Sequence, residues 1–150
     1  MAVTRAPGGA LGVRWGTDAE LAAETLGLAG RPWLAWRGDP AFEVCDDAAV
    51  RVGAFGAPAR PRVIRWGKRV AGMQLEYPAS ACDDVRRTVA ATWGVDGPAP
   101  YRQWLRGQVV HLGTDATGCT LTLSGARWGR AFAADQLRQG LGGLAAGLQP

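Results

Sequence analysis

The sequence predicts an α+β fold in which an antiparallel β-sheet, built from a strand meander and a later hairpin, carries about three helices on one face. Two observations lead to this prediction. Apolar residues alternate with a period of two between Pro32 and Tyr77, and two further strand-like runs follow at 108–113 and 118–124. Helix signals occur before, between and after these regions. The 150 residues are expected to form one domain, with residues 1–12 as a flexible tail.

The first helix is predicted from the sequence Thr17-Asp18-Ala19-Glu20. This is the pattern of a capping box, in which the Thr17 hydroxyl accepts from the backbone of Glu20 and the Glu20 side chain reaches back. Leu21, Thr25 and Leu28 then follow at helical spacing, and Gly30 and Pro32 supply a stop.

The clearest strand pair is Arg62–Trp66 with Arg69–Tyr77, joined by a Gly67-Lys68 turn of type II′. Pairing across this turn places Ile64 opposite Ala71. One face would then be buried and hold Ile64, Trp66, Ala71, Met73, Leu75 and Tyr77. The other face would hold Arg65, Gln74 and Glu76, so the sheet is expected to meet water or a partner on that side only.

Two further helices are predicted. The second starts with Ser80 as N-cap, ends at Gly94, and buries a stripe of Ala81, Val85, Val89 and Trp93. The third runs over 128–148 with a leucine stripe at 137, 141, 144 and 148. Glycines at 140, 142, 143 and 147 each cost about 1 kcal/mol relative to alanine in a helix interior, so this helix needs something to pack against.

The compartment is predicted from the hydropathy and the cysteines. The sequence has neither a secretory signal pattern nor an unbroken apolar run of about 18 residues, so we expect a cytoplasmic protein without a membrane span. Cys45, Cys82 and Cys119 are then expected to be reduced and to pack as small hydrophobic residues. Their even spacing of 37 does not indicate a repeat, because the flanking residues do not align.

The net charge of +4 comes from sixteen arginines and Lys68 against thirteen acids. Five cations lie within ten residues that contain no acid, and they are candidate binding residues for an anion: Arg60, Arg62, Arg65, Lys68 and Arg69. Phosphate contacts with stacking on Trp66 would suit a nucleic acid. The sequence disfavours this partner, because Trp66 is expected in the core and no reader motif accompanies the charge.

His111 is the only histidine and the candidate catalytic residue. Its ordinary pKa lies near neutrality, so it could act as a general base beside Asp115 or the hydroxyls of Thr120 and Thr122. A metal site with Asp115 and Cys119 is not expected, because the hairpin sends His111 and Cys119 to opposite faces. The acidic pairs Asp46-Asp47 and Asp83-Asp84 are interpreted as structural. No metal and no cofactor is predicted.

Seven tryptophans are unusually many for this length. Trp33 and Trp36 are separated by an odd number of residues and cannot share one face of a regular strand. One of them is therefore expected in solvent, in an interface or at a bend, and both are candidate binding residues. The order helix, meander, helix, hairpin, helix resembles the small secretion-chaperone and YbjN-like folds. That resemblance implies a dimeric binder of partner segments.

Three hypotheses about function follow from these features. The first is a non-enzymatic binding or adaptor protein whose partner is another protein or a second copy of itself. The second is a small enzyme or ligand-binding protein with a Trp-lined pocket, in which His111 is the base and Arg65 orients an anionic ligand. The third is nucleic-acid binding through the hairpin over residues 60–69.

Overall fold

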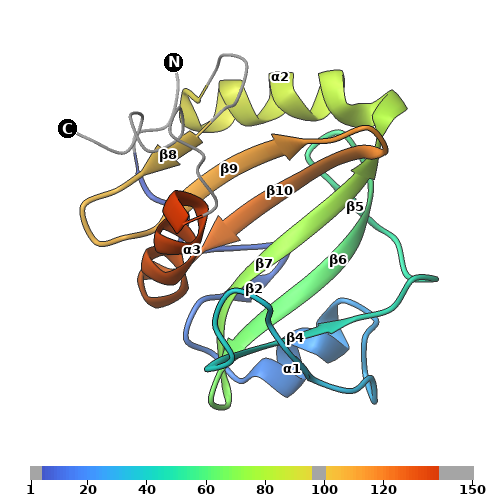
Figure 1. Ribbon diagram of the computed structural model, residues 1–150. Coiled ribbons are helices and arrows are strands. Elements are labelled where there is room, and N and C mark those ends of the chain that lie inside the picture. Colours follow the sequence, from blue (N-terminus) through green and yellow to red (C-terminus); the bar gives the residue numbers. More distant parts are fainter. Residues whose placement is uncertain (1–4, 96–100, 139–150) are drawn as a thin grey trace.

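The computed structural model describes residues 5–95 and 101–138, and within them it confirms the predicted α+β fold class (Figure 1). Three helices contact an eight-stranded antiparallel sheet, and a separate two-stranded hairpin precedes them. The helices are α1 (Ala19–Thr25), α2 (Cys82–Trp93) and α3 (Ala126–Arg138). The strands are β1 (Gly9–Ala10), β2 (Val13–Arg14), β3 (Leu34–Ala35), β4 (Phe42–Asp46), β5 (Val52–Ala54), β6 (Ala57–Trp66), β7 (Arg69–Pro78), β8 (Tyr101–Gln103), β9 (Val109–Thr114) and β10 (Gly118–Ser124).

The main sheet has the order β3-β4-β6-β7-β10-β9-β8, and β5 pairs with β6 off this path. Both predicted hairpins are present: β6 pairs with β7 across the Gly67-Lys68 turn, where Gly67 has a φ of 61°, and β9 pairs with β10. The long strands β6, β7 and β10 therefore form the middle of the sheet, and the short strands lie at its edges.

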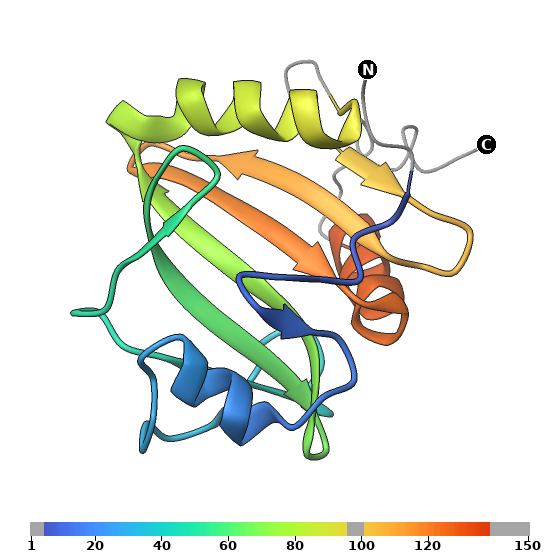
Figure 2. The ribbon, with the colours of Figure 1, turned by 180° about the vertical axis from the view of Figure 1, so that it is seen from behind.

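The helices lie on both faces of the sheet, which differs from the expected single face. Helices α1 and α2 pack on a first face, where Val63, Met73 and Leu75 are buried. Helix α3 covers part of the second face, where Trp128 packs with Phe42, Ile64 and Ala71 (Figures 1 and 2). A Cβ on Gly72 would lie 2.3 Å from Cε3 of Trp128, so the absence of a side chain there lets the indole rest on β7.

The predicted register of β6 and β7 is wrong by one residue beyond the turn. Arg65 pairs with Val70, but Ile64 pairs with Gly72, so the extra residue Ala71 forms a bulge in β7. A one-residue slip exchanges the two faces of a strand. Ile64 therefore faces α3, whereas Met73, Leu75 and Tyr77 remain on the face of α1 and α2. The bulge creates the apolar patch that α3 covers.

The N-terminal region contains β1 and β2, which form a hairpin; β1 lies within residues 1–12, the segment predicted as a flexible tail, and β2 follows it directly. Trp15 donates from Nε1 to the Pro7 carbonyl at 2.9 Å. The predicted capping box at α1 is wrong: Asp18 is the N-cap and accepts from the backbone N–H groups of Glu20 and Leu21, whereas the Thr17 hydroxyl donates to the Arg14 carbonyl. Asp18 is a better acceptor at this position because its carboxylate is charged.

Helix α2 follows the prediction at its C-terminal end and differs at its start. Val85, Val89 and Trp93 are buried, and Gly94 ends the helix in a left-handed conformation with a φ of 69°. Ser80 is not the cap; it lies in a short 3-10 turn over Ala79–Ala81 that precedes the helix. Of the leucines predicted to form a stripe in α3, Leu141, Leu144 and Leu148 lie outside the described residues, as do the predicted glycines. No helix within residues 5–95 and 101–138 is long and apolar enough to cross a membrane.

The cysteine prediction is wrong for two of the three residues. Cys82 at the start of α2 and Cys119 near the start of β10 form a disulfide, with their Cα atoms 6.0 Å apart. They meet because Cys119 pairs with Tyr77, one residue before Pro78 and the turn that leads into α2. Cys45 is free and buried as expected, and burial raises the pKa of its thiol.

Candidate functional site

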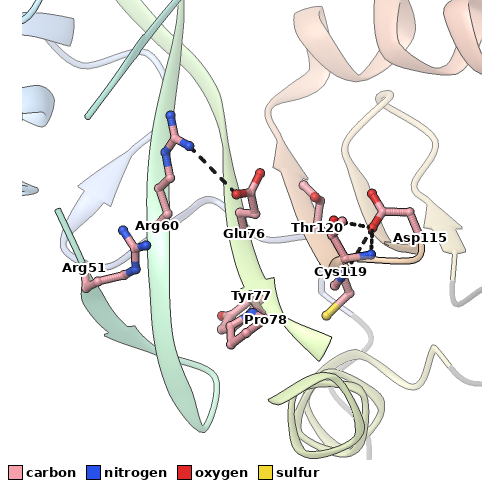
Figure 3. A pocket seen from close by; sticks show the side chains of 10 residues that line it. Arg51, Arg60, Glu76, Tyr77, Pro78, Asp115, Cys119 and Thr120 are labelled. Atoms are coloured by element: carbon pink, nitrogen blue, oxygen red, sulfur yellow. Dashed lines mark hydrogen bonds and ion pairs between the residues drawn. The ribbon is translucent and has the colours of Figure 1, made fainter. Parts of the chain in front are cut away.

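The part of the second face that α3 leaves open contains two adjoining hollows, which we call the sheet groove. The first has a volume of about 260 Å³ and the second about 380 Å³, and both are lined by Asp115 and Thr120. In the first hollow, Arg51 and Arg60 lie on one side of Glu76, and Thr120 and Asp115 on the other (Figure 3). The second hollow crosses four neighbouring strands and is lined by Trp36, Arg62, Gln74, His111, Gly113, Thr114, Asp115, Thr120, Thr122, Phe132 and Gln136.

His111 lies on β9 at the edge of α3 and lines the second hollow. As predicted, it shares a face with Thr122, its cross-strand partner, and not with Cys119. Its ring lies between Tyr101 at 5.5 Å and Phe132 at 5.6 Å, measured between centroids. The residue is only 9% exposed, and burial lowers the pKa of the imidazole to about 4. His111 is therefore neutral at pH 7, with one ring nitrogen as donor and one as acceptor.

The arginines of the groove are matched by carboxylates. Asp46 accepts from Nη2 of Arg60 at 2.6 Å and from Nε of Arg62 at 3.2 Å. Glu76 accepts from Nη2 of Arg62 at 2.7 Å and lies 3.9 Å from Nη1 of Arg60. Two positive and two negative side chains thus form one network across β4, β6 and β7. The groove presents hydrogen-bonding groups here without a net charge.

The other polar side chains of the groove come from β7, β10 and the turn before β10. Gln74 donates from Nε2 to the Thr122 hydroxyl at 3.2 Å. Asp115 accepts from the Thr117 hydroxyl and from the backbone N–H groups of Thr117 and Gly118. These bonds, led by the one from the Thr117 hydroxyl, lower the pKa of Asp115. The carboxylate expected beside His111 is instead engaged in holding the turn.

Trp33 and Trp36 lie on opposite faces, as their spacing predicted. Trp33 packs against the cluster of the first face, and Trp36 against that of the second. Both are half-buried. Trp33 donates from Nε1 to Glu20 at 2.8 Å and lies 4.2 Å beneath the guanidinium of Arg65. Arg65 is paired with Glu20 and Glu43, so it belongs to this first-face cluster and not to the groove.

Lys68 and Arg69 lie at the turn between β6 and β7, apart from the groove. Trp66, which was expected in the core, is 42% exposed here because it is the last residue of β6. The guanidinium of Arg127 from α3 lies 3.7 Å from the Trp66 ring centroid. The cationic run over 60–69 is thus divided among three places: the groove, the Trp33 cluster and this turn.

Within residues 5–95 and 101–138, no group of three or more His, Cys, Asp or Glu side chains is arranged to hold a metal ion. The acidic pairs take structural contacts. In the first pair, Asp46 and Asp47 each form an ion pair with an arginine, and Asp47 also accepts from the backbone N–H of Ala49. In the second pair, Asp83 and Asp84 form ion pairs with Arg86 and Arg87 on α2.

Sequence reasoning missed several groove residues. Beside the groove, Tyr101 lies outside the predicted helices and strands; it begins the short strand β8 and packs against the ring of His111. Phe132 and Gln136 lie in the predicted third helix, but nothing in the sequence placed that helix on the second face. The spacing of Trp128 and Phe132, four residues apart, was the available signal for a buried helical stripe.

The fold and the groove define an α+β protein with an open polar sheet face. Comparison with known proteins finds no matching family model, no matching curated protein and no matching solved structure.

Proposed function

We propose that the protein is a non-enzymatic binding protein that takes an extended polar segment of a protein partner across the sheet groove. The observation that supports this most is the row of hydrogen-bonding side chains on four neighbouring strands: Arg62 on β6, Gln74 on β7, Thr120 and Thr122 on β10, and His111 on β9. These groups both donate and accept, which suits a peptide backbone, where every residue offers one donor and one acceptor.

The size of the groove fits a short peptide segment. Neighbouring strands lie about 4.8 Å apart, so the distance from β6 to β9 across β7 and β10 is about 14 Å. An extended chain advances about 3.5 Å per residue, so about four residues would cross the groove. Trp36 and Phe132 form an aromatic wall beside this path, where an apolar side chain of the segment could pack.

The electrostatics of the groove favour a neutral segment. Arg60 and Arg62 are already compensated by Asp46 and Glu76, so an anionic ligand would have to compete with these carboxylates. The pKa of His111 favours a role in binding over a role in catalysis. A general base works best when its pKa is near the working pH, and with a pKa of about 4 the imidazole of His111 is a weak base.

The test is site-specific photo-crosslinking in the cells that make the protein. A photoreactive phenylalanine analogue is placed at Thr120 in the groove, and in a matched control at Arg87, an exposed residue of α2. We expect a polypeptide adduct only from position 120, and a native mass equal to the protein plus that partner, or twice the protein if the partner is a second copy. Both variants must unfold at the urea concentration of the parent.

Two results would overturn this function. An adduct of metabolite mass at position 120 would support the ligand-binding or enzymatic alternative. Equal polypeptide adducts from positions 120 and 87 would show contact without a preferred site.

A further inference from the structure

The turn between β6 and β7 carries positive charge that no ion pair among the described residues compensates. Arg60, Arg62 and Arg65 each contact a carboxylate. By contrast, within the described residues neither Lys68 nor Arg69 forms an ion pair. Arg69 donates from Nη1 to the Gly16 carbonyl at 2.7 Å, which holds the guanidinium in place without neutralising it.

The same turn exposes an aromatic ring. Trp66 is 42% exposed, with the guanidinium of Arg127 over its ring. A hollow of about 430 Å³ lies beside it and is lined by Asp18, Trp66, Gly67, Lys68 and Arg69. Asp18 is the only acid of this lining, and its carboxylate already accepts two backbone N–H groups at the start of α1.

We propose that this hollow, which we call the turn site, binds a nucleotide unit. Its base would stack on the face of Trp66 that Arg127 does not cover, and its phosphate would be contacted by Lys68 and Arg69. An aromatic ring beside unpaired cations is the combination that binds unpaired bases together with their backbone phosphates. The volume lies within the range of about 300–1,000 Å³ that is typical of small-ligand sites.

The nucleotide unit could belong to a free nucleotide or to a single-stranded nucleic acid. The space beside the turn is open, since a Cβ built on Gly67 would meet no atom within 4 Å. A free nucleotide and a nucleotide within a longer strand could therefore both approach the turn site. The turn site shares no lining residue with the sheet groove. Nucleotide binding at the turn site is therefore a second function, and its test does not depend on whether the groove binds a protein segment.

The test measures the binding of a short fluorescein-labelled oligothymidylate by fluorescence anisotropy at several salt concentrations. We expect Trp66→Ala to weaken binding about tenfold, because base stacking is lost. We expect Lys68→Gln with Arg69→Gln to weaken binding and to lower the slope of log affinity against log salt by about 1.4, the value for two lost phosphate contacts.

The matched control is Arg86→Gln with Arg87→Gln on α2, which removes the same charge away from the turn. We expect the control to bind like the wild type. Unchanged binding by Trp66→Ala, or an equal loss in the control pair, would overturn the proposal.

The source of the nucleotide is distinguished by competition. AMP that displaces the oligonucleotide, in a manner that depends on Trp66, supports the site and points to free nucleotides; much weaker displacement by AMP points to a single strand. Displacement by inorganic phosphate as effective as that by AMP would overturn the stacking role. Binding to phosphatidylserine vesicles without binding to the oligonucleotide would show an anionic membrane surface as the ligand and would also overturn the proposal.

Discussion

Loss of the Cys82–Cys119 disulfide should lower the free energy of unfolding by about 4 kcal/mol. The bridge joins residues 37 apart, and the chain-entropy relation for closing a loop of this length gives about 4 kcal/mol at 25 °C. The effect arises in the unfolded chain, which gains conformations once the bridge is removed. For a protein of this size, the corresponding fall in Tm is about 10 °C.

The assay is urea unfolding followed by tryptophan fluorescence, for the wild type and for Cys82→Ala, Cys119→Ala and the double variant. Either single substitution removes the whole bridge, so each should lose nearly as much stability as the double variant. The reasoning is refuted if the two single losses add, or if the oxidised and the reduced wild type unfold at the same urea concentration.

Alkylation of the denatured protein checks the bridge directly. Without reductant, only Cys45 should react. If free thiols are blocked as the cells are opened, the same measurement tests the cytoplasmic location expected from the sequence, because a reducing compartment would leave all three cysteines open to alkylation.

Three further predictions concern stability. The pKa of His111 is about 4 in the folded protein against 6.5 in the unfolded chain, so between pH 6.5 and pH 4 the unfolded chain takes up a proton that the folded protein does not. As the pH falls over this range, the free energy of unfolding of the wild type should therefore decrease by about 3 kcal/mol more than that of His111→Gln, as measured by urea unfolding at each pH. Gly72→Ala should lower the free energy of unfolding by about 1–3 kcal/mol, because the added Cβ would overlap Trp128. Gly53→Ala is the control: there is open space around its Cβ, so it should change this free energy by less than about 0.5 kcal/mol, and thermal unfolding compares the two variants. Gly94→Ala should cost about 1 kcal/mol, since alanine disfavours the φ of 69° that ends α2; equal thermal stability of variant and wild type would contradict this.

The sequence was sufficient for the local elements of the fold and insufficient for the arrangement of its faces. The Gly67-Lys68 turn, the stop at Gly94 and the pairing of β9 with β10 depend on neighbouring residues, so their patterns are visible in the sequence. The bulge at Ala71 depends on contacts with a helix more than fifty residues later, since Gly72 is the residue on which Trp128 rests. No local pattern marks that choice, and it decides which side chains share a face.

The cysteines show a similar limit. The spacing of 37 residues was visible, but a disulfide requires two Cα atoms close together, and their distance is set by the register of β10 on β7. With Cys119 paired to Tyr77, the start of β10 lies beside the turn into α2, where Cys82 stands. The prediction of reduced thiols depended on an expected compartment and therefore had no geometric basis.

The five cations over residues 60–69 differ in whether a carboxylate compensates them, and this difference decides which of them can bind an anion. Arg60, Arg62 and Arg65 are neighbours of Lys68 and Arg69 in the sequence, and a count of charge treats all five alike. Their compensating acids are Glu20, Glu43, Asp46 and Glu76, which come from α1, β4 and β7. Among the described residues, these acids form ion pairs with the three arginines and not with Lys68 or Arg69. Of these five cations, the pair at the turn is therefore the one without a compensating carboxylate among the described residues. A substitution of Asp46 tests this view. Asp46→Asn should leave Glu76 as the one carboxylate that contacts both Arg60 and Arg62, so the groove should gain one uncompensated positive charge and an affinity for oligothymidylate that persists in the Trp66→Ala background. If Asp46→Asn leaves oligonucleotide binding unchanged in that background, compensation by carboxylates is not what keeps the groove from binding anions.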